Sequence, residues 1–103
     1  KRTAASVPGE TLRAIQECFA LPPLRYRMSA DEIRSGYQKV EELCAEAIAA
    51  HADAPDLWIV RNRRIVAQLG LWKLTSDQAH YQRAVEEAKA CNLPIVVHRH
   101  GFY

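Results

Sequence analysis

The densest group of chemically capable side chains is a basic run near the middle of the chain, Arg61-Asn62-Arg63-Arg64. Guanidinium groups bind carboxylates and phosphates through paired hydrogen bonds, so this run could capture an acidic ligand. On a helix Arg61 and Arg64 share a face while Arg63 points elsewhere, so the run does not form one patch. The alternative is that the arginines are solvated or ion-paired and cover Trp58 or Trp72 with their stems.

A second candidate lies near the end of the chain, where His98 and His100 flank Arg99. In an extended segment alternate residues lie on one side, so the two imidazoles could share a metal ion. A metal site needs a third and often a fourth ligand, and no spacing in the sequence brings one to this pair. No Cys-x-x-Cys pair occurs. We therefore expect no metal and no cofactor.

The three cysteines, Cys18, Cys44 and Cys91, are far apart in the sequence, and small buried side chains on helices are their simplest interpretation. Cys91 is the candidate nucleophile, because His98 and His100 follow it. Cys91 is expected close to the end of a helix, however, where the partial negative charge raises a thiol pKa. We therefore expect no catalytic residue and no enzymatic activity.

The composition fits a folded domain, with 49% apolar and 25% charged residues and a net charge of +2. Interleaved charges leave no basic surface for nucleic acid, and no apolar run approaches the roughly 18 residues of a membrane-spanning helix. The odd number of cysteines favours a reducing, cytoplasmic compartment. Because the chain begins at Lys1 and its single methionine is Met28, we expect it to be part of a longer protein.

Helices must position these residues. Residues 1–8 lack periodicity and predict a flexible tail, and residues 9–20 predict a short helix capped by Thr11. Its apolar face consists of Leu12, Ile15, Cys18 and Phe19. Pro23 ends the helix because it removes a backbone donor and forces the preceding residue into an extended conformation, which leaves residues 25–27 in a connection.

The clearest helix signal begins at Ser29, which forms a capping box with Glu32. An apolar stripe at helical spacing follows it: Ile33, Tyr37, Val40, Leu43, Cys44, Ala47 and Ile48. Gly36 interrupts this helix, and it either permits a close contact with another helix or weakens the first turns. The connection at residues 51–55 is short, so the next helix packs antiparallel to this one.

The third helix is predicted to begin at Pro55, capped by Asp53 or Ala54, and to run through Gly70 to Thr75. Apolar residues lie on more than one side of it, so two neighbours should bury it.

A capping cluster at residues 75–77 predicts a fourth helix, which Asn92 closes. Its inward positions are Ala79, Tyr81, Ala84, Val85 and Ala88. Residues 93–103 are interrupted by Pro94 and rich in β-branched side chains, which predicts an extended tail.

Two of these helices share a pattern, because Cys44-x-x-Ala47-Ile48 matches Tyr81-x-x-Ala84-Val85 and Trp58 follows eleven residues after Ala47. In this arrangement, with Pro55 in the turn, residues 36–90 resemble the tetratricopeptide repeat family. Asn62 and Asp77 depart from the small residues usual at their positions.

The resemblance implies an all-α, right-handed stack of antiparallel hairpins, with about four helices in residues 9–92, whose groove binds an extended peptide or a partner helix. Carried over position by position, the groove residues are Asp56, Ile59, Arg63 and Val66. Their neighbours Trp58 and Ile65 are packing residues.

We therefore expect a non-catalytic protein–protein interaction or scaffold module of a larger protein, with a protein or peptide partner and an option of self-association through the repeat ends. One alternative is an accessory helical domain of an enzyme whose catalytic part lies outside this chain. Another is weak phosphate or nucleic-acid binding through residues 61–64, although three arginines are few for useful affinity at physiological salt.

Overall fold

The computed structural model describes residues 5–19 and 24–92, and every regular element in this part of the chain is helical. The elements are α1 (Gly9–Glu17), the short 3-10 turn η1 (Leu24–Arg27), α2 (Ala30–Ala50), α3 (Leu57–Thr75) and α4 (Gln78–Cys91). The predicted all-α class with four helices is confirmed. The predicted tail at residues 93–103 lies outside the described residues.

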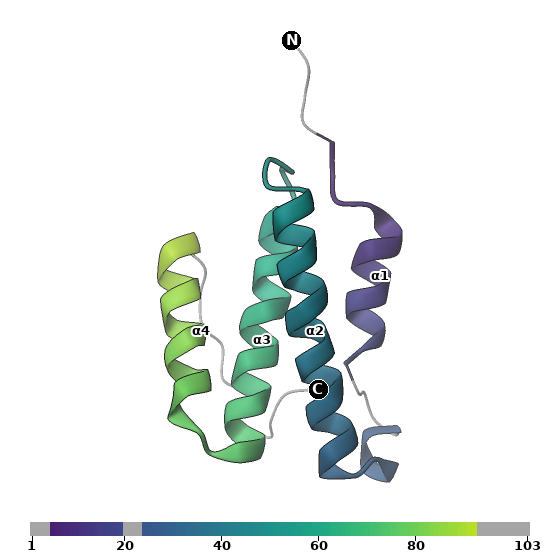
Figure 1. Cartoon of the computed structure of the whole chain (residues 1–103), viewed down its shortest axis with the longest axis vertical. Coiled ribbons are helices and arrows are strands. Elements are labelled where there is room, and N and C mark those ends of the chain that lie inside the picture. The colour runs from purple at the N-terminus through teal and green to yellow at the C-terminus, as the bar shows by residue number, and fades with distance from the viewer. Residues whose placement is uncertain (1–4, 20–23, 93–103) are drawn as a thin grey trace.

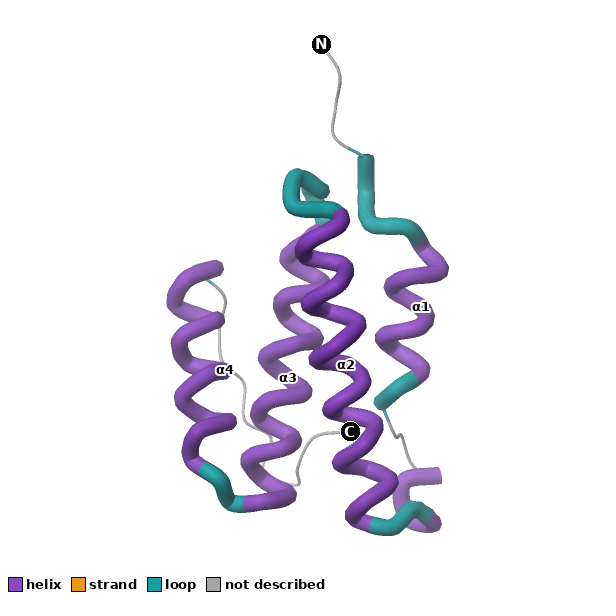
Figure 2. Tube along the Cα trace, in the orientation of Figure 1, coloured by secondary structure: helices purple, strands orange, loops and turns teal. Residues whose placement is uncertain are grey.

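The four α-helices lie side by side in chain order, and successive helices run in opposite directions (Figure 1). α2 packs against α1 on one side and α3 on the other, and α3 also packs against α4. Short loops make both the α2–α3 and the α3–α4 connections (Figure 2), as expected for antiparallel neighbours.

Local capping chemistry sets three of the helix ends. The Ser29 hydroxyl accepts a hydrogen bond from the Glu32 N–H at 3.1 Å, and the Glu32 carboxylate accepts one from the Ser29 N–H at 3.0 Å, which confirms the capping box. Asp77 caps α4 by accepting from the Ala79 N–H, and Asn92 closes it in the left-handed region with a φ of 54°. These ends needed only residues close in sequence.

Two helix starts differ from the sequence prediction. α1 is capped at Pro8, because the carbonyl of Pro8 accepts from the N–H groups of Thr11 and Leu12, and Thr11 lies inside the first turn. α3 begins at Leu57 with Asp56 at its N-cap, two residues after Pro55. The Asp56 carboxylate does not cap α3 but accepts a hydrogen bond from the Val7 N–H at 2.9 Å, and Val7 itself is buried.

Of the other predictions about single segments and residues, the structure confirms some and differs from others. The segment expected to be a plain connection at residues 25–27 forms η1, and α3 runs through Gly70 to Thr75 as predicted. On α4, Ala84 and Ala88 are buried as expected, whereas Ala79 is exposed. Ala79 lies in the first turn of α4, directly after the short loop that joins α3 to α4.

Two apolar clusters hold the helices together. The first joins α1, α2 and α3 and contains the whole predicted stripe of α2, with four members buried and three packed against them. The second joins α3 to α4 through Ile65, Leu69, Ala84 and Ala88. Val66 packs against both clusters. α3 is therefore buried by two neighbours, as its apolar residues on more than one side predicted.

Two glycines allow close helix contacts. A Cβ atom on Gly36 would lie 2.6 Å from the carbonyl oxygen of Cys18, just past the end of α1. A Cβ atom on Gly70 would lie 2.5 Å from the nearest ring carbon of Tyr37. Gly36 therefore permits a close contact between α2 and the end of α1. This was one of the two interpretations of Gly36, the other being that it weakens the first turns of its helix.

Candidate functional site

One face of α3 carries a polar series that looks into the space between α2 and α4. Arg61, Arg64 and Gln68 follow one another at spacings of three and four residues, so they lie on the same side of the helix. The side chains that meet them come from both neighbouring helices. This face therefore connects three helices through polar contacts.

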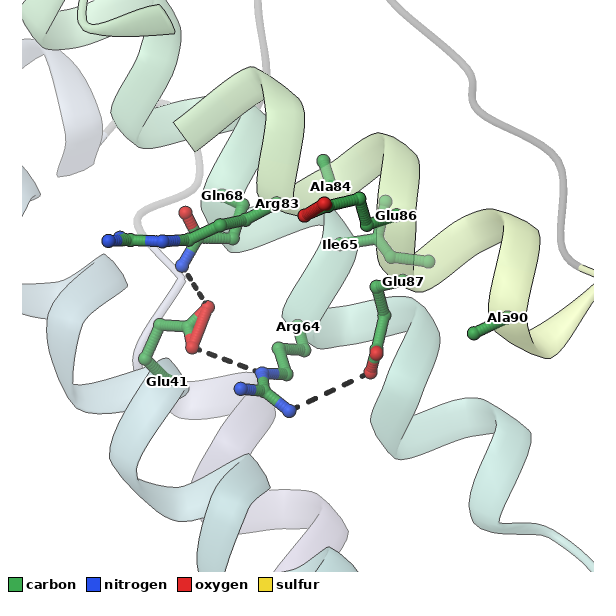
Figure 3. A pocket seen from close by; sticks show the side chains of 9 residues that line it. All are labelled: Glu41, Arg64, Ile65, Gln68, Arg83, Ala84, Glu86, Glu87 and Ala90. Atoms are coloured by element: carbon green, nitrogen blue, oxygen red, sulfur yellow. Dashed lines mark hydrogen bonds and ion pairs between the residues drawn. The ribbon is translucent and has the colours of Figure 1, made fainter. Parts of the chain in front are cut away.

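Glutamates on both sides hold the arginines. The Arg64 Nε–H donates to a carboxylate oxygen of Glu41 on α2 at 3.1 Å, and its Nη1 lies 3.7 Å from the Glu87 carboxylate on α4. The Arg61 Nη1–H donates to the same Glu87 oxygen at 3.3 Å. Figure 3 shows Arg64 between the two carboxylates. Both arginines of this face are therefore ion-paired, which is one of the two alternatives for the basic run.

Gln68 extends the network. Its side chain is only 6% exposed, its amide N–H donates to the second oxygen of Glu41, and its amide oxygen lies 2.8 Å from the His80 Nδ1. Every fully buried side-chain nitrogen and oxygen of the described residues has a partner. A satisfied network fixes the geometry of the groups it connects. The side chains of the polar face of α3 are therefore held in a fixed geometry.

A pocket of about 500 Å³ lies over this network. It is lined by Glu41, Arg64, Ile65, Gln68, Arg83, Ala84, Glu86, Glu87 and Ala90 (Figure 3). A shallower pocket of about 390 Å³ adjoins it and is lined by Trp58, Arg61, Ala90 and Cys91. Ala90 lines both pockets, and we call the two together the α3–α4 groove.

Trp58 is the main correction to the sequence prediction. Trp58 was expected to pack inside the fold, yet it is 57% exposed. Ile65, the other residue predicted to pack there, is buried. Trp58 lies in the first turn of α3, and α4 ends at Cys91 beside it. Within the described chain no helix extends far enough to cover the indole.

Two charges of the groove have no partner within the described part of the chain. Arg83 and Glu86, both exposed on α4, form no hydrogen bond or ion pair with any described residue. Arg64 and Arg61, in contrast, already share the carboxylates of Glu41 and Glu87. A ligand that needs a free cation in this groove would therefore meet Arg83.

The residues predicted to bind a partner lie on the other side of α3. At 100° per residue, the face of Ile59, Arg63 and Val66 points roughly 170° away from that of Arg61, Arg64 and Gln68. Asp56 is occupied by the Val7 N–H, Val66 packs against both clusters, and Arg63 donates to the Asn62 side chain at 3.2 Å. Ile59 and Arg63 are half-buried. None of the four lines the groove.

The cysteines lie apart, and all three are free. Burial, reinforced by the nearby Glu41, raises the pKa of the Cys44 thiol to about 12. Burial also raises the pKa of the Cys18 thiol. Cys91 lies beside Trp58, and the two histidines considered as its bases, His98 and His100, fall outside the described residues. Among the described residues no three His, Cys, Asp or Glu side chains come together as a metal site.

The sequence interpretation missed the acidic half of the groove. Neither Glu41 nor Glu87 was identified as a partner of the arginines. Both are acidic residues far from the arginines in sequence, and nothing local indicates which arginine each would meet. The available signal was Gln68, a polar side chain in helical register with Arg61 and Arg64.

No protein-family model, curated protein or solved structure matches this chain. None of the helices in the described part is both long and apolar enough to cross a membrane.

Proposed function

We propose that this domain is a non-catalytic protein-interaction module, a tetratricopeptide-repeat-like array of antiparallel hairpins that binds a short segment of a partner protein in the α3–α4 groove. The observation that supports this most directly is the exposed indole of Trp58 beside the charged pocket. Tryptophan and arginine are the residues most enriched where partner proteins bind tightly. A reducing, cytoplasmic setting suits the three free cysteines.

The support beneath the groove favours binding. Ile65 and Ala84 are buried in the cluster that joins α3 to α4, and Gln68 is held from two sides. A groove whose walls are already ordered loses little side-chain freedom when a ligand enters. The dimensions suit a short segment, since Trp58 and Gln68 are ten residues apart on α3 and the helix rises about 15 Å between them. An extended chain covers that length with four or five residues.

The outer faces favour a short partner segment over stacking of a second copy on the repeat ends. The exposed positions of α4 include Gln78, Gln82, Glu86 and Lys89, and those of α1 include Glu10, Arg13, Gln16 and Glu17. Stacking another copy on either face would bury the charged members of these sets and desolvate the glutamines, which is costly without matched partners. Polar outer faces are also typical of the terminal helices of a finite array.

A random peptide library selected against the immobilised full chain tests this proposal. We expect enriched peptides that no longer bind when Ala90→Trp fills the groove at the residue common to both pockets. Ala79→Trp is the matched control, because Ala79 is exposed on the same helix but lines neither pocket. Thermal melts should show that both variants are folded.

The same experiment also tests the face of α3 that the sequence predicted to bind a partner. Arg63→Glu should leave groove-dependent peptides unaffected. Peptides that are lost with Arg63→Glu and retained with Ala90→Trp would move the binding site to the face of Asp56, Ile59, Arg63 and Val66. Failure to enrich any peptide that responds to Ala90→Trp or Arg63→Glu would contradict the proposed function.

A further inference from the structure

We infer that the α3–α4 groove selects an extended segment in which an apolar side chain and a carboxylate lie three or four residues apart, the first against Trp58 and the second on Arg83. This inference rests on the proposed function and names the chemistry of its partner.

The apolar end of the groove is the pocket at Trp58. Ala90 and Cys91 from α4 form its other wall, and the Arg61 charge at its edge is already matched by Glu87. The exposed part of the indole has no apolar neighbour in the described chain that removes it from water. A leucine or an aromatic side chain placed there would bury apolar surface on both partners.

The charged end is Arg83. Its guanidinium has no partner among the described residues, and Figure 3 shows its side chain extended along the pocket toward Gln68 and away from Glu87. The guanidinium of Arg64 below it already donates to Glu41 and lies beside Glu87. A ligand carboxylate can therefore bind Arg83 without breaking an existing ion pair.

Glu86 and Glu87 restrict where that carboxylate can lie. Both are nearer than Arg83 to the Trp58 end of α4. Glu87 is paired with Arg61 and Arg64, but Glu86 has no partner among the described residues, so an acidic residue directly beside the apolar anchor would meet the negative charge of Glu86. Cys91 lies at Trp58, and Arg83 is eight residues earlier, or about 12 Å along the helix. Three or four residues of an extended chain cover this distance.

The same charges disfavour a polyanion. The larger pocket is lined by three carboxylates, of Glu41, Glu86 and Glu87, against two guanidinium groups, of Arg64 and Arg83. Phosphate chains need several unpaired cations in a row, and the described residues that line the groove offer one. One carboxylate at a defined distance from an apolar side chain matches the groove better.

Blocked heptapeptides test the inference directly. The first probe is Gly-Leu-Ser-Gly-Asp-Gly-Ser with both ends capped, and the second has Leu and Asp exchanged, because an extended segment could bind in either direction. Three comparison peptides carry Asn or Lys in place of Asp, or Asp directly beside Leu. Binding is followed by tryptophan fluorescence of the full chain carrying Trp72→Phe, in which Trp58 is the single tryptophan.

We expect one of the two Asp peptides to bind about two- to fivefold more tightly than its Asn and adjacent-Asp counterparts, the range of an exposed ion pair. Arg83→Glu should reverse the order, so that the Lys peptide binds more tightly than the Asp peptide. Arg13→Glu is the matched control, since Arg13 is exposed on α1, which packs on the far side of α2 from α3, and the preference should not change.

Each of the following results would overturn the inference. Equal binding of the Asp and Asn peptides, or an Asp preference that survives Arg83→Glu, would remove the carboxylate from the site. Iodide quenching of Trp58 no stronger than that of a buried tryptophan would show that the full chain already covers the pocket. If library selection yields groove-dependent peptides of another chemistry, this inference fails and the proposed function stands. If it yields no peptide that responds to Ala90→Trp or Arg63→Glu, both fail.

Discussion

Replacing Gly70 with alanine should destabilise the protein, although the same change stabilises most helices. At an unconstrained helical position Gly→Ala gains about 1 kcal/mol. At Gly70 the added Cβ atom would lie 2.5, 2.7 and 2.8 Å from three ring carbons of Tyr37. Carbon atoms in contact lie about 3.5–4.0 Å apart, so the ring would have to move by about 1 Å.

The surroundings of Tyr37 resist that movement. Its side chain is only 2% exposed, and its ring meets that of Phe19 edge-on with centroids 6.0 Å apart. Overpacking a core of this kind costs about 1–3 kcal/mol. After subtraction of the helical gain, Gly70→Ala should lower the free energy of unfolding by up to about 2 kcal/mol.

Urea denaturation followed by far-UV circular dichroism measures this change. Gly9→Ala is the matched control, because nothing lies within 4 Å of a Cβ atom at Gly9, and it should be neutral or stabilising. A double-mutant cycle with Tyr37→Leu tests the cause. Tyr37→Leu should lower the free energy of unfolding by about 1 kcal/mol less in the Gly70→Ala background than in the parent protein. The reason is that the alanine methyl group then enters space that the tyrosine ring has left. A Gly70→Ala variant as stable as Gly9→Ala, or additive changes in the cycle, would refute the reasoning.

The remaining predictions concern the capping box of α2 and the buried thiol. Ser29→Ala should cost about 1 kcal/mol in a thermal melt at neutral pH, as loss of an N-cap does; an unchanged melting temperature would show that the cap contributes nothing. Hydrogen bonds with the backbone N–H of Ser29 and with its side chain hold the pKa of the Glu32 carboxyl below its ordinary value of 4.5. The folded state therefore binds this proton less readily than the unfolded chain, and its contribution is present above pH 4.5 and lost as the pH falls through the lowered pKa. Acid titration of stability should be shallower in Ser29→Ala, and parallel titrations would contradict this. With a pKa of about 12 against an ordinary 9.0, the Cys44 thiol should contain about 1000-fold less thiolate near neutral pH. In mass-spectrometric alkylation Cys44 should therefore react only when the chain unfolds, and rapid modification of the folded protein at this position would refute its burial.

The candidate site could be predicted only in part. Arg61 and Arg64 were identified as one face of a helix, and ion pairing was one of the two interpretations of their charge. The identity of their partners could not be predicted, because Glu41 is 23 residues from Arg64 and Glu87 is 26 residues from Arg61. The prediction of Asp56, Ile59, Arg63 and Val66 as binding residues came from a family resemblance, and the groove lies on the opposite side of α3.

The sequence by itself determined the features that depend on residues within one turn of each other. Ser29 and Glu32 fix the start of α2, Asp77 fixes that of α4, and Asn92 ends the last helix, because each satisfies backbone groups a few residues away.

Tertiary structure decided which side chains are covered. Trp58 and Ile65 are both apolar positions of α3, but the neighbouring helix covers Ile65 and ends beside Trp58. Hydrophobic spacing shows which face of a helix tends to leave water, whereas the reach of the adjacent helix decides whether a given side chain does so. That difference leaves the indole of Trp58 exposed beside Cys91, at one end of the groove.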